Sequence, residues 1–252
     1  MKHLESALLW CLAVVRRTLE TVVQKLAGCF GYEIRKISQS RTEKQGFALY
    51  NYLKEDGSFD YDRYHKTQTA GNKSKIANVW VIEENVAFLS NYIKTGLGPP
   101  LFGICHGTRR GKEQQWFKKY LGCEVIGTEI SDSAGLFPDT IQWDFHETKP
   151  EWIDAVDFIY SNSFDHSYDP EKCLNAWMSC VRKGGVCILE HSSSGHGPCH
   201  ASALDPFGAD LVQMSYLITL WGKGRYGVRE LVETPRKNED VAFLHFIVIQ
   251  RF

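Results

Sequence analysis

The sequence predicts an α/β fold built on a doubly wound, largely parallel β-sheet, and three observations support this prediction. From Pro99 onward, short apolar runs alternate with segments of helical periodicity, which is typical of successive βαβ units. Seven apolar runs fall within roughly the last 150 residues, enough strands for one such domain. Polar side chains follow several of these runs, at the carboxyl ends of strands where doubly wound sheets bind their ligands.

The elements of this domain are predicted in order along the chain. Strands are expected at 101–105, 124–128, 140–143, 156–160, 186–190, 229–233 and 241–249. Helices are expected between them at 109–120, 131–136 and 170–181. Arg182 and Lys183 and two glycines follow the last helix, as suits a helix C-terminus, where basic side chains offset the dipole and glycine ends the helix.

Residues 1–98 are predicted to form a helical extension and a lid, and residues 99–252 the sheet domain. Apolar residues recur at helical spacing over 4–26, which predicts an amphipathic helix that packs on this domain, on a second copy of the chain, or on a membrane surface. Residues 46–78 are aromatic and polar and predict loops and short helices that fold over a ligand, with 64–68 as a candidate contact. A further helix, capped by Asn78, is expected at 79–93.

The composition argues against several classes of protein. The chain has 29 Lys and Arg against 30 Asp and Glu, a net charge of −1, which predicts that no nucleic acid is bound. No apolar stretch is long enough to span a bilayer, so we expect a cytoplasmic protein, with peripheral membrane contact as the alternative. The 8 cysteines form no C-x-x-C pair, which indicates reduced, buried thiols and no metal site.

The candidate ligand-binding residues are polar or aromatic residues that follow the first five predicted strands. They are Cys105, His106, Gly107, Thr108, Glu129, Asp144, Phe145, Asn162, Ser163, His166 and His191. Glu129 lies about twenty residues beyond the first turn, where nucleotide-binding folds place an acceptor for ribose hydroxyls. Asp144 can accept a hydrogen bond from an adenine amino group while Phe145 stacks on the base. Alternatively, Glu129 caps the next helix and Asp144 is a solvated turn residue.

One segment carries a resemblance to a known family. The stretch His166-Ser167-Tyr168-Asp169-Pro170, followed by a helix and then by Arg182-Lys183-Gly184-Gly185, resembles a motif of the class I S-adenosylmethionine-dependent methyltransferases, in particular of the small-molecule branch. The resemblance covers residues 101–190. It implies a Rossmann-like seven-stranded sheet that is mostly parallel, with helices on both faces and an antiparallel last strand at 241–249.

The resemblance also implies how S-adenosyl-L-methionine (SAM) is bound. The turn of Cys105, His106, Gly107 and Thr108 would hold the methionine part, Glu129 the ribose hydroxyls, Asp144 and Phe145 the adenine, and Asn162 and Ser163 would lie near the transferable methyl group. This sequence departs from the first motif of the family. Gly103, Cys105 and Arg109 stand where the motif has its acidic residue and its first and third glycines. Arg109 or Arg110 is a candidate to pair with the cofactor carboxylate instead.

The function expected from the resemblance is SAM-dependent methyl transfer to a small-molecule, sugar or lipid-precursor acceptor. Transfer requires a positioned nucleophile and often a base, and His191 and His166 are the leading candidates, ahead of His196. Residues 192–229 form a long insertion that is expected to build the acceptor-site wall. Two alternatives stay open: a non-catalytic cofactor-binding or scaffold protein of the same fold, and a nicotinamide-dependent oxidoreductase.

Overall fold

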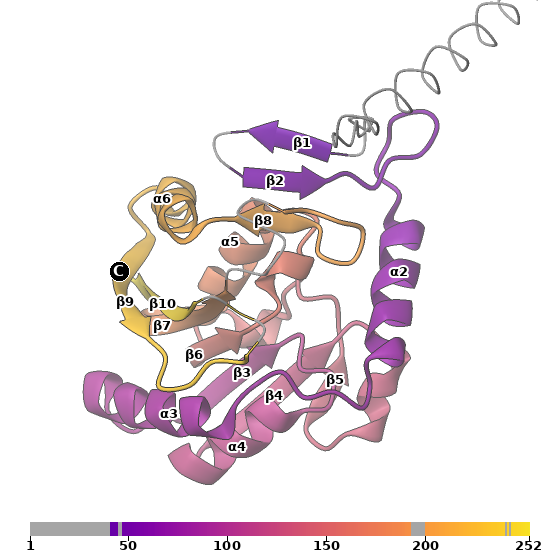
Figure 1. Cartoon of the computed structure of the whole chain (residues 1–252). Coiled ribbons are helices and arrows are strands. Elements are labelled where there is room, and N and C mark those ends of the chain that lie inside the picture. The colour runs from indigo at the N-terminus through magenta and orange to yellow at the C-terminus, as the bar shows by residue number, and fades with distance from the viewer. Residues whose placement is uncertain (1–40, 45–46, 193–199, 240, 242) are drawn as a thin grey trace, which may run out of the picture. The chain divides into compact units, whose positions relative to one another are not determined.

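A computed structural model describes residues 41–44, 47–192, 200–239, 241 and 243–252 (Figure 1). The helix predicted at 4–26 and the candidate His196 lie outside the described residues. The described residues belong to one compact unit, which extends from Ser40 to Phe252.

A seven-stranded sheet forms the centre of the fold and has the order β5-β4-β3-β6-β7-β10-β9. Its strands are β3 (Phe102–His106), β4 (Glu124–Glu129), β5 (Thr140–Gln142), β6 (Val156–Ser161), β7 (Val181–Ser192), β9 (Tyr226–Glu233) and β10 (Leu244–Arg251). The first five strands pair in parallel, whereas β10 is antiparallel to both of its neighbours, β7 and β9. The predicted doubly wound sheet with an antiparallel last strand is therefore confirmed.

Helices cover both faces of this sheet (Figure 1). On one face lie α3 (Glu83–Leu97) and α4 (Lys112–Leu121), and on the other lie α5 (Pro170–Cys180) and α6 (Leu211–Gly222). Adjacent residues of a strand point to opposite faces, so Ile104 joins the cluster that contains α5 and α6, and Cys105 joins the cluster that contains α3 and α4. Because both faces are buried, the central strands are continuous apolar runs, the pattern from which they are predicted.

Several predicted helix boundaries shift in the structure. The helix expected at 79–93 is α3 at Glu83–Leu97, with two glutamates in its first turn that suit the positive end of the helix dipole. The predicted cap, Asn78, is wrong, because the helix begins four residues later and its N-cap residue is Ile82, which makes no side-chain capping hydrogen bond. Its predicted apolar face is confirmed, because Val86, Leu89 and Ile93 are fully buried. The helix expected at 131–136 is a short 3-10 helix, Asp132–Leu136. Asp169 caps α5 by accepting a hydrogen bond from the backbone N–H of Lys172.

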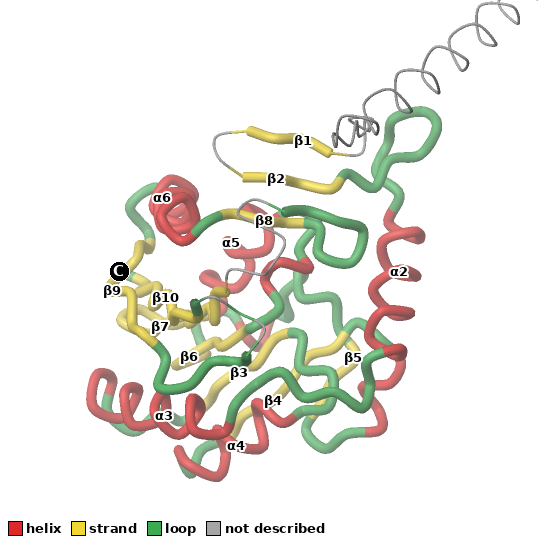
Figure 2. Tube along the Cα trace, in the orientation of Figure 1, coloured by secondary structure: helices red, strands yellow, loops and turns green. Residues whose placement is uncertain are grey.

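Other elements were not predicted. Residues 46–78 contain a 14-residue helix, α2 (Tyr61–Ser74), rather than only loops and short helices, and the insertion 192–229 contains α6. A second sheet has the order β1-β2-β8, from β1 (Arg41–Lys44), β2 (Phe47–Tyr50) and β8 (Phe207–Ala209), and is separate from the large sheet (Figure 2). β2 pairs with β8 from far along the chain, and local patterns carry no signal for such a pairing.

The structure also bears on the cysteines and on membrane insertion. The described cysteines are free thiols; Cys105, Cys173, Cys180 and Cys187 are buried, and Cys123 is half-buried. Within the described ranges, no helix is both long enough and apolar enough to cross a membrane.

Candidate functional site

Two adjoining cavities lie at the carboxyl ends of β3, β4 and β6. The smaller has a volume of about 60 Å³ and the larger about 1120 Å³. They share five wall residues, which are Lys75, Gly107, Arg109, Ser163 and His166. A ligand that occupied both cavities would therefore pass the turn after β3, as expected for a doubly wound sheet.

Glu129 ends β4 and lies in the wall of the smaller cavity, where its side chain is almost fully buried. Its Oε2 accepts a hydrogen bond from the backbone N–H of Arg109 at 3.1 Å, and its Oε1 accepts one from the N–H of Ser131 at 3.0 Å. Burial raises the pKa of this carboxyl group. Each oxygen keeps a second lone pair, so the carboxylate can still accept hydrogen bonds from a vicinal diol.

The turn between β3 and α4 approaches its neighbours closely. Gly107 has a φ of +74°, and a Cβ atom there would lie 2.6 Å from the Cβ of Ser163. Arg109 also has a positive φ, of 41°, although it is not glycine. Arg109 stands where the resemblance expects the third glycine, and its backbone has the positive φ that glycine adopts easily. In this conformation the backbone N–H of Arg109 donates to Glu129.

Asp144 follows β5 and belongs to a buried hydrogen-bond chain. Its Oδ1 accepts from the backbone N–H of His146 at 2.9 Å and lies 2.7 Å from His146 Nδ1. Burial lowers the pKa of His146, and the neutral ring donates from Nδ1 while its Nε2 accepts from the Ser167 hydroxyl at 2.8 Å. The Tyr61 hydroxyl of α2 donates to Asp144 Oδ2 at 2.9 Å. No pattern in the sequence connects Asp144 with His146, Ser167 or Tyr61.

Two of the predicted cofactor residues contribute to neither cavity wall. Cys105 is fully buried in the cluster under α3 and α4. His106 stacks on Trp177 with ring centroids 4.5 Å apart, and its Nδ1 lies 2.8 Å from Thr128 Oγ1. Burial lowers the pKa of His106 to about 3, so this ring is neutral and packs as part of the core.

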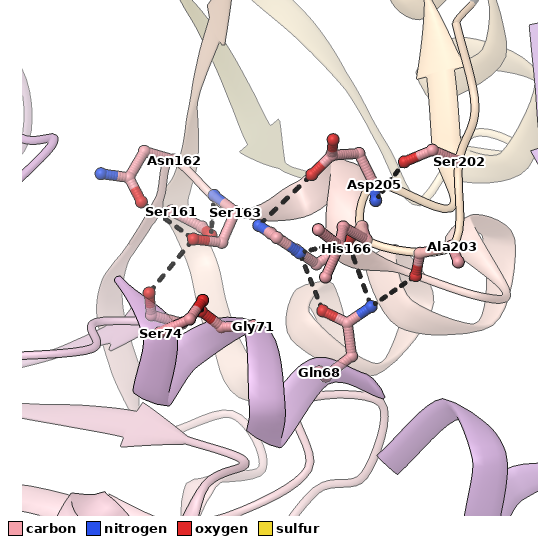
Figure 3. Close-up of polar contacts among 12 residues, drawn as sticks. Gln68, Gly71, Ser74, Ser161, Asn162, Ser163, His166, Ser202, Ala203 and Asp205 are labelled. Carbon is pink, nitrogen blue, oxygen red and sulfur yellow. Dashed lines mark hydrogen bonds and ion pairs between the residues drawn. The ribbon is translucent and has the colours of Figure 1, made fainter. Parts of the chain in front are cut away.

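Asn162 and Ser163 follow β6 (Figure 3); Ser163 lines both cavities and Asn162 lines the larger one. The Ser163 hydroxyl lies 3.1 Å from the backbone oxygen of Gly107 and 3.0 Å from Asn162 Oδ1. The backbone N–H of Ser163 donates to the hydroxyl of Ser161 at 3.0 Å. This network fixes the end of β6 against the turn after β3.

His166 is positioned by α2 and by the loop before β8, as Figure 3 shows. Its Nδ1 donates to the oxygens of Gln68 and Leu204, at 2.9 and 2.8 Å, so the lone pair of the neutral ring is on Nε2. Asp165 and Asp205 come near it, and among the described residues these three are the group whose ligand atoms could gather around a metal ion. Two of the three are only half-buried, and the prediction that no metal is bound remains a prediction.

The wall of the larger cavity contains two buried glutamates and a half-buried histidine. Glu113 lies in the first turn of α4, and Glu190 and His191 lie near the end of β7. Burial raises the pKa of Glu113 to about 8 and that of Glu190 to about 7. Burial lowers the pKa of His191 to about 4, so its ring is neutral at pH 7. Glu113 was not predicted, because a glutamate in the first turn of a helix is an ordinary feature.

Most of the predicted site residues therefore meet around the two cavities. The smaller cavity is lined by Gly107, Arg109, Glu129, Asp144, Phe145, Ser163 and His166, and the larger by Gly107, Thr108, Arg109, Asn162, Ser163, His166 and His191. Arg110 also lines the larger cavity, and its guanidinium donates to the backbone oxygen of Ala77. Residues of α2 also line the smaller cavity, among them Tyr64 and Gln68 of the segment predicted to contact a ligand; that this segment folds over a ligand remains a prediction.

The fold is similar to those of solved methyltransferases. The Burkholderia thailandensis 1,6-didemethyltoxoflavin-N1-methyltransferase, solved with S-adenosylhomocysteine (SAH), is 14% identical with a TM-score of 0.59 over 86% of this chain and 97% of that chain. The plantazolicin methyltransferase BpumL, also solved with SAH, is 12% identical with a TM-score of 0.56 over 76% of this chain and 96% of that one. The [4+2]-cyclase SpnF is 8% identical with a TM-score of 0.57 over 82% and 99%.

These similarities define the class of fold. No family model and no curated protein sequence matches the chain. The chain has the fold of the class I SAM-dependent methyltransferases, as the resemblance in its sequence predicts. The cyclase shares this fold, so the reaction has to be argued from the residues of the site.

Proposed function

We propose that this protein is a SAM-dependent methyltransferase that acts on a small-molecule acceptor. The observation that carries the proposal is the buried carboxylate of Glu129, at the end of β4 in the smaller cavity. Two backbone N–H groups fix this carboxylate, and its free lone pairs suit the ribose hydroxyls of SAM. The sequence predicts the same residue for this role.

The remaining residues of the smaller cavity fit the other parts of SAM. Phe145 offers an aromatic surface for adenine, and Gly107 leaves room that a Cβ atom would fill. Arg109 lines both cavities and can pair with the carboxylate of the methionine part. When bound, SAM supplies an electrophilic methyl group, and the chain supplies position and proton removal.

The larger cavity supports an acceptor of small-molecule size. Its volume of about 1120 Å³ is near the upper end of the range of roughly 300–1,000 Å³ typical of small-molecule sites. Ser163 lines both cavities and Asn162 beside it lines the larger one, which supports their placement near the reacting atoms. His191 and His166 remain the proposed histidine bases; both line this cavity, and His191 Nε2 has no hydrogen-bond partner.

We infer that α2 acts as a lid on the cofactor. The smaller cavity, about 60 Å³, is far below the roughly 300 Å³ at which small-molecule sites begin, so adenosine cannot enter unless its wall moves. Contacts of α2 hold that wall: Tyr61 donates to Asp144, and the Tyr64 hydroxyl donates to the backbone oxygen of His166. Both contacts break and reform if α2 opens to admit SAM.

Calorimetry with SAH tests the proposal. We expect SAH to bind the full chain and to raise its melting temperature, whereas NAD should do neither. Glu129→Ala should weaken SAH binding by about tenfold or more, since two charge-assisted hydrogen bonds to the ribose are lost. Glu124→Ala is the matched control, because Glu124 is exposed at the opposite end of the same strand. Absence of SAH binding, or equal affinity of the two variants, would refute the proposal.

A further inference from the structure

Two carboxyl groups in the wall of the larger cavity are buried with incomplete hydrogen bonding. Glu113 is 6% exposed and Glu190 is 8% exposed. Glu113 Oε1 accepts from Asn162 Nδ2 at 3.3 Å, and Glu190 Oε2 accepts from the Tyr160 hydroxyl at 2.7 Å. Within the described residues, the second oxygen of each group, Oε2 of Glu113 and Oε1 of Glu190, is buried without a donor in hydrogen-bond geometry, although the Trp80 side chain approaches the Glu190 carboxyl group.

The described part of the chain provides no ion pair to either carboxyl group. A buried carboxylate without a counter-charge destabilises the fold. Protonation removes the charge, but the carboxyl group still lacks a hydrogen-bond partner, because the new O–H group also needs an acceptor. Two such residues in one cavity wall serve the fold poorly, which points to a role in binding a ligand.

The ligand that best completes this pair is a nitrogen cation. An ammonium group supplies the missing positive charge and up to three N–H donors, whereas a hydroxyl supplies one hydrogen and no charge. Aromatic side chains of the same wall, Trp80 and Phe243, favour a cation or an aryl group beside it. We propose that Glu113 and Glu190 bind the acceptor and that this acceptor is an amine.

This inference rests on the proposed function and specifies its acceptor. The bound ammonium gives one proton to a carboxylate of the pair, which leaves a nitrogen lone pair. That lone pair forms the new N–C bond to the methyl group of SAM as the S–C bond breaks, and the bonding electrons stay on sulfur. The products are a methylated ammonium ion, SAH and a protonated carboxyl group. The raised pKa of Glu113, about 8, and of Glu190, about 7, suits carboxylates that accept a proton near neutral pH.

Calorimetry on the full chain saturated with SAH tests the inference. The probes are two amines, phenethylamine and tryptamine, and the alcohols of matching shape, phenethyl alcohol and tryptophol. Each amine should bind at least about tenfold more tightly than its alcohol. Glu113→Gln and Glu190→Gln should each remove most of this difference without changing SAH affinity. Glu239→Gln is the control, because Glu239 lies in the same wall but is exposed, and the preference for amines should persist.

The outcomes separate this inference from the proposed function. If SAH does not bind, the proposed function fails and the inference falls with it. If SAH binds but neither amine binds more tightly than its alcohol, the inference alone is refuted. A preference for amines that survives both glutamine variants, or that Glu239→Gln removes equally, also refutes the assignment of the pair.

Discussion

Replacing Glu113 by glutamine should stabilise the protein at neutral pH. In the folded state the pKa of Glu113 is raised from its ordinary value of 4.5 to about 8, mainly by burial. The unfolded chain therefore releases this proton at lower pH, and the free energy of unfolding falls as pH rises from 4.5 towards 8. At pH 7 this penalty is about 3 kcal/mol, and at pH 5 it is about 1 kcal/mol. Glutamine has nearly the same shape and cannot ionise, so Glu113→Gln removes the penalty.

Urea unfolding measures this effect. Wild type and Glu113→Gln should differ by about 3 kcal/mol at pH 7, with the variant more stable, and the difference should shrink to about 1 kcal/mol at pH 5. Glu190 titrates in the same direction in both proteins, so the pH dependence of the variant is reduced rather than abolished. Glu124→Gln is the control, since its exposed side chain should leave stability nearly unchanged at both pH values.

Two results would refute this reasoning. A Glu113→Gln variant that is less stable than wild type at pH 7 would mean that the carboxylate is well satisfied in the folded state. A difference that does not change between pH 5 and pH 7 would mean that Glu113 titrates normally in the fold.

Three further variants test the cofactor cavity. Arg109→Gly should stabilise the fold by about 1 kcal/mol, because glycine adopts the positive φ without strain, whereas Arg109→Ala should not. Both variants should bind SAH more weakly, and equal urea midpoints for the two would argue against backbone strain. Tyr61→Phe should speed SAH association by about two- to tenfold in stopped-flow measurements, because the bond to Asp144 no longer opposes opening of α2; an unchanged rate would remove α2 as the lid. Gly107→Ala should destabilise the fold by more than about 1 kcal/mol and weaken SAH binding, because its Cβ would meet Ser163; wild-type values for both would contradict the close approach.

The sequence allowed the large sheet to be predicted in detail because its strands are buried on both faces. Their apolar runs are continuous, and glycines and charged residues mark the ends. Glu129 was also predictable, because the topology alone places the residue after β4 at the binding edge. These signals are local in sequence and need no knowledge of distant contacts.

Features that depend on distant contacts could not be predicted. Tyr61 contacts Asp144 only because α2 crosses the end of the sheet, and no local pattern connects the two residues. Cys105 and His106 were predicted as part of the turn, yet they are the last two residues of β3 and both side chains are buried in the core. Glu113 shows the same limit, because its burial depends on how α4 packs on β3 and β4 and not on its neighbours in the chain.

The pairing of β2 with β8 has a consequence for how the protein is made. β8 supplies Phe207, Gly208 and Ala209 to the wall of the larger cavity, and its partner strand comes from near the start of the described chain. On the ribosome, β2 emerges early and can pair with β1, but its other edge stays unpaired until β8 follows, after five strands of the large sheet are already synthesised. The pocket for the acceptor is thus completed late in biosynthesis, whereas Glu129 and Asp144 emerge well before it.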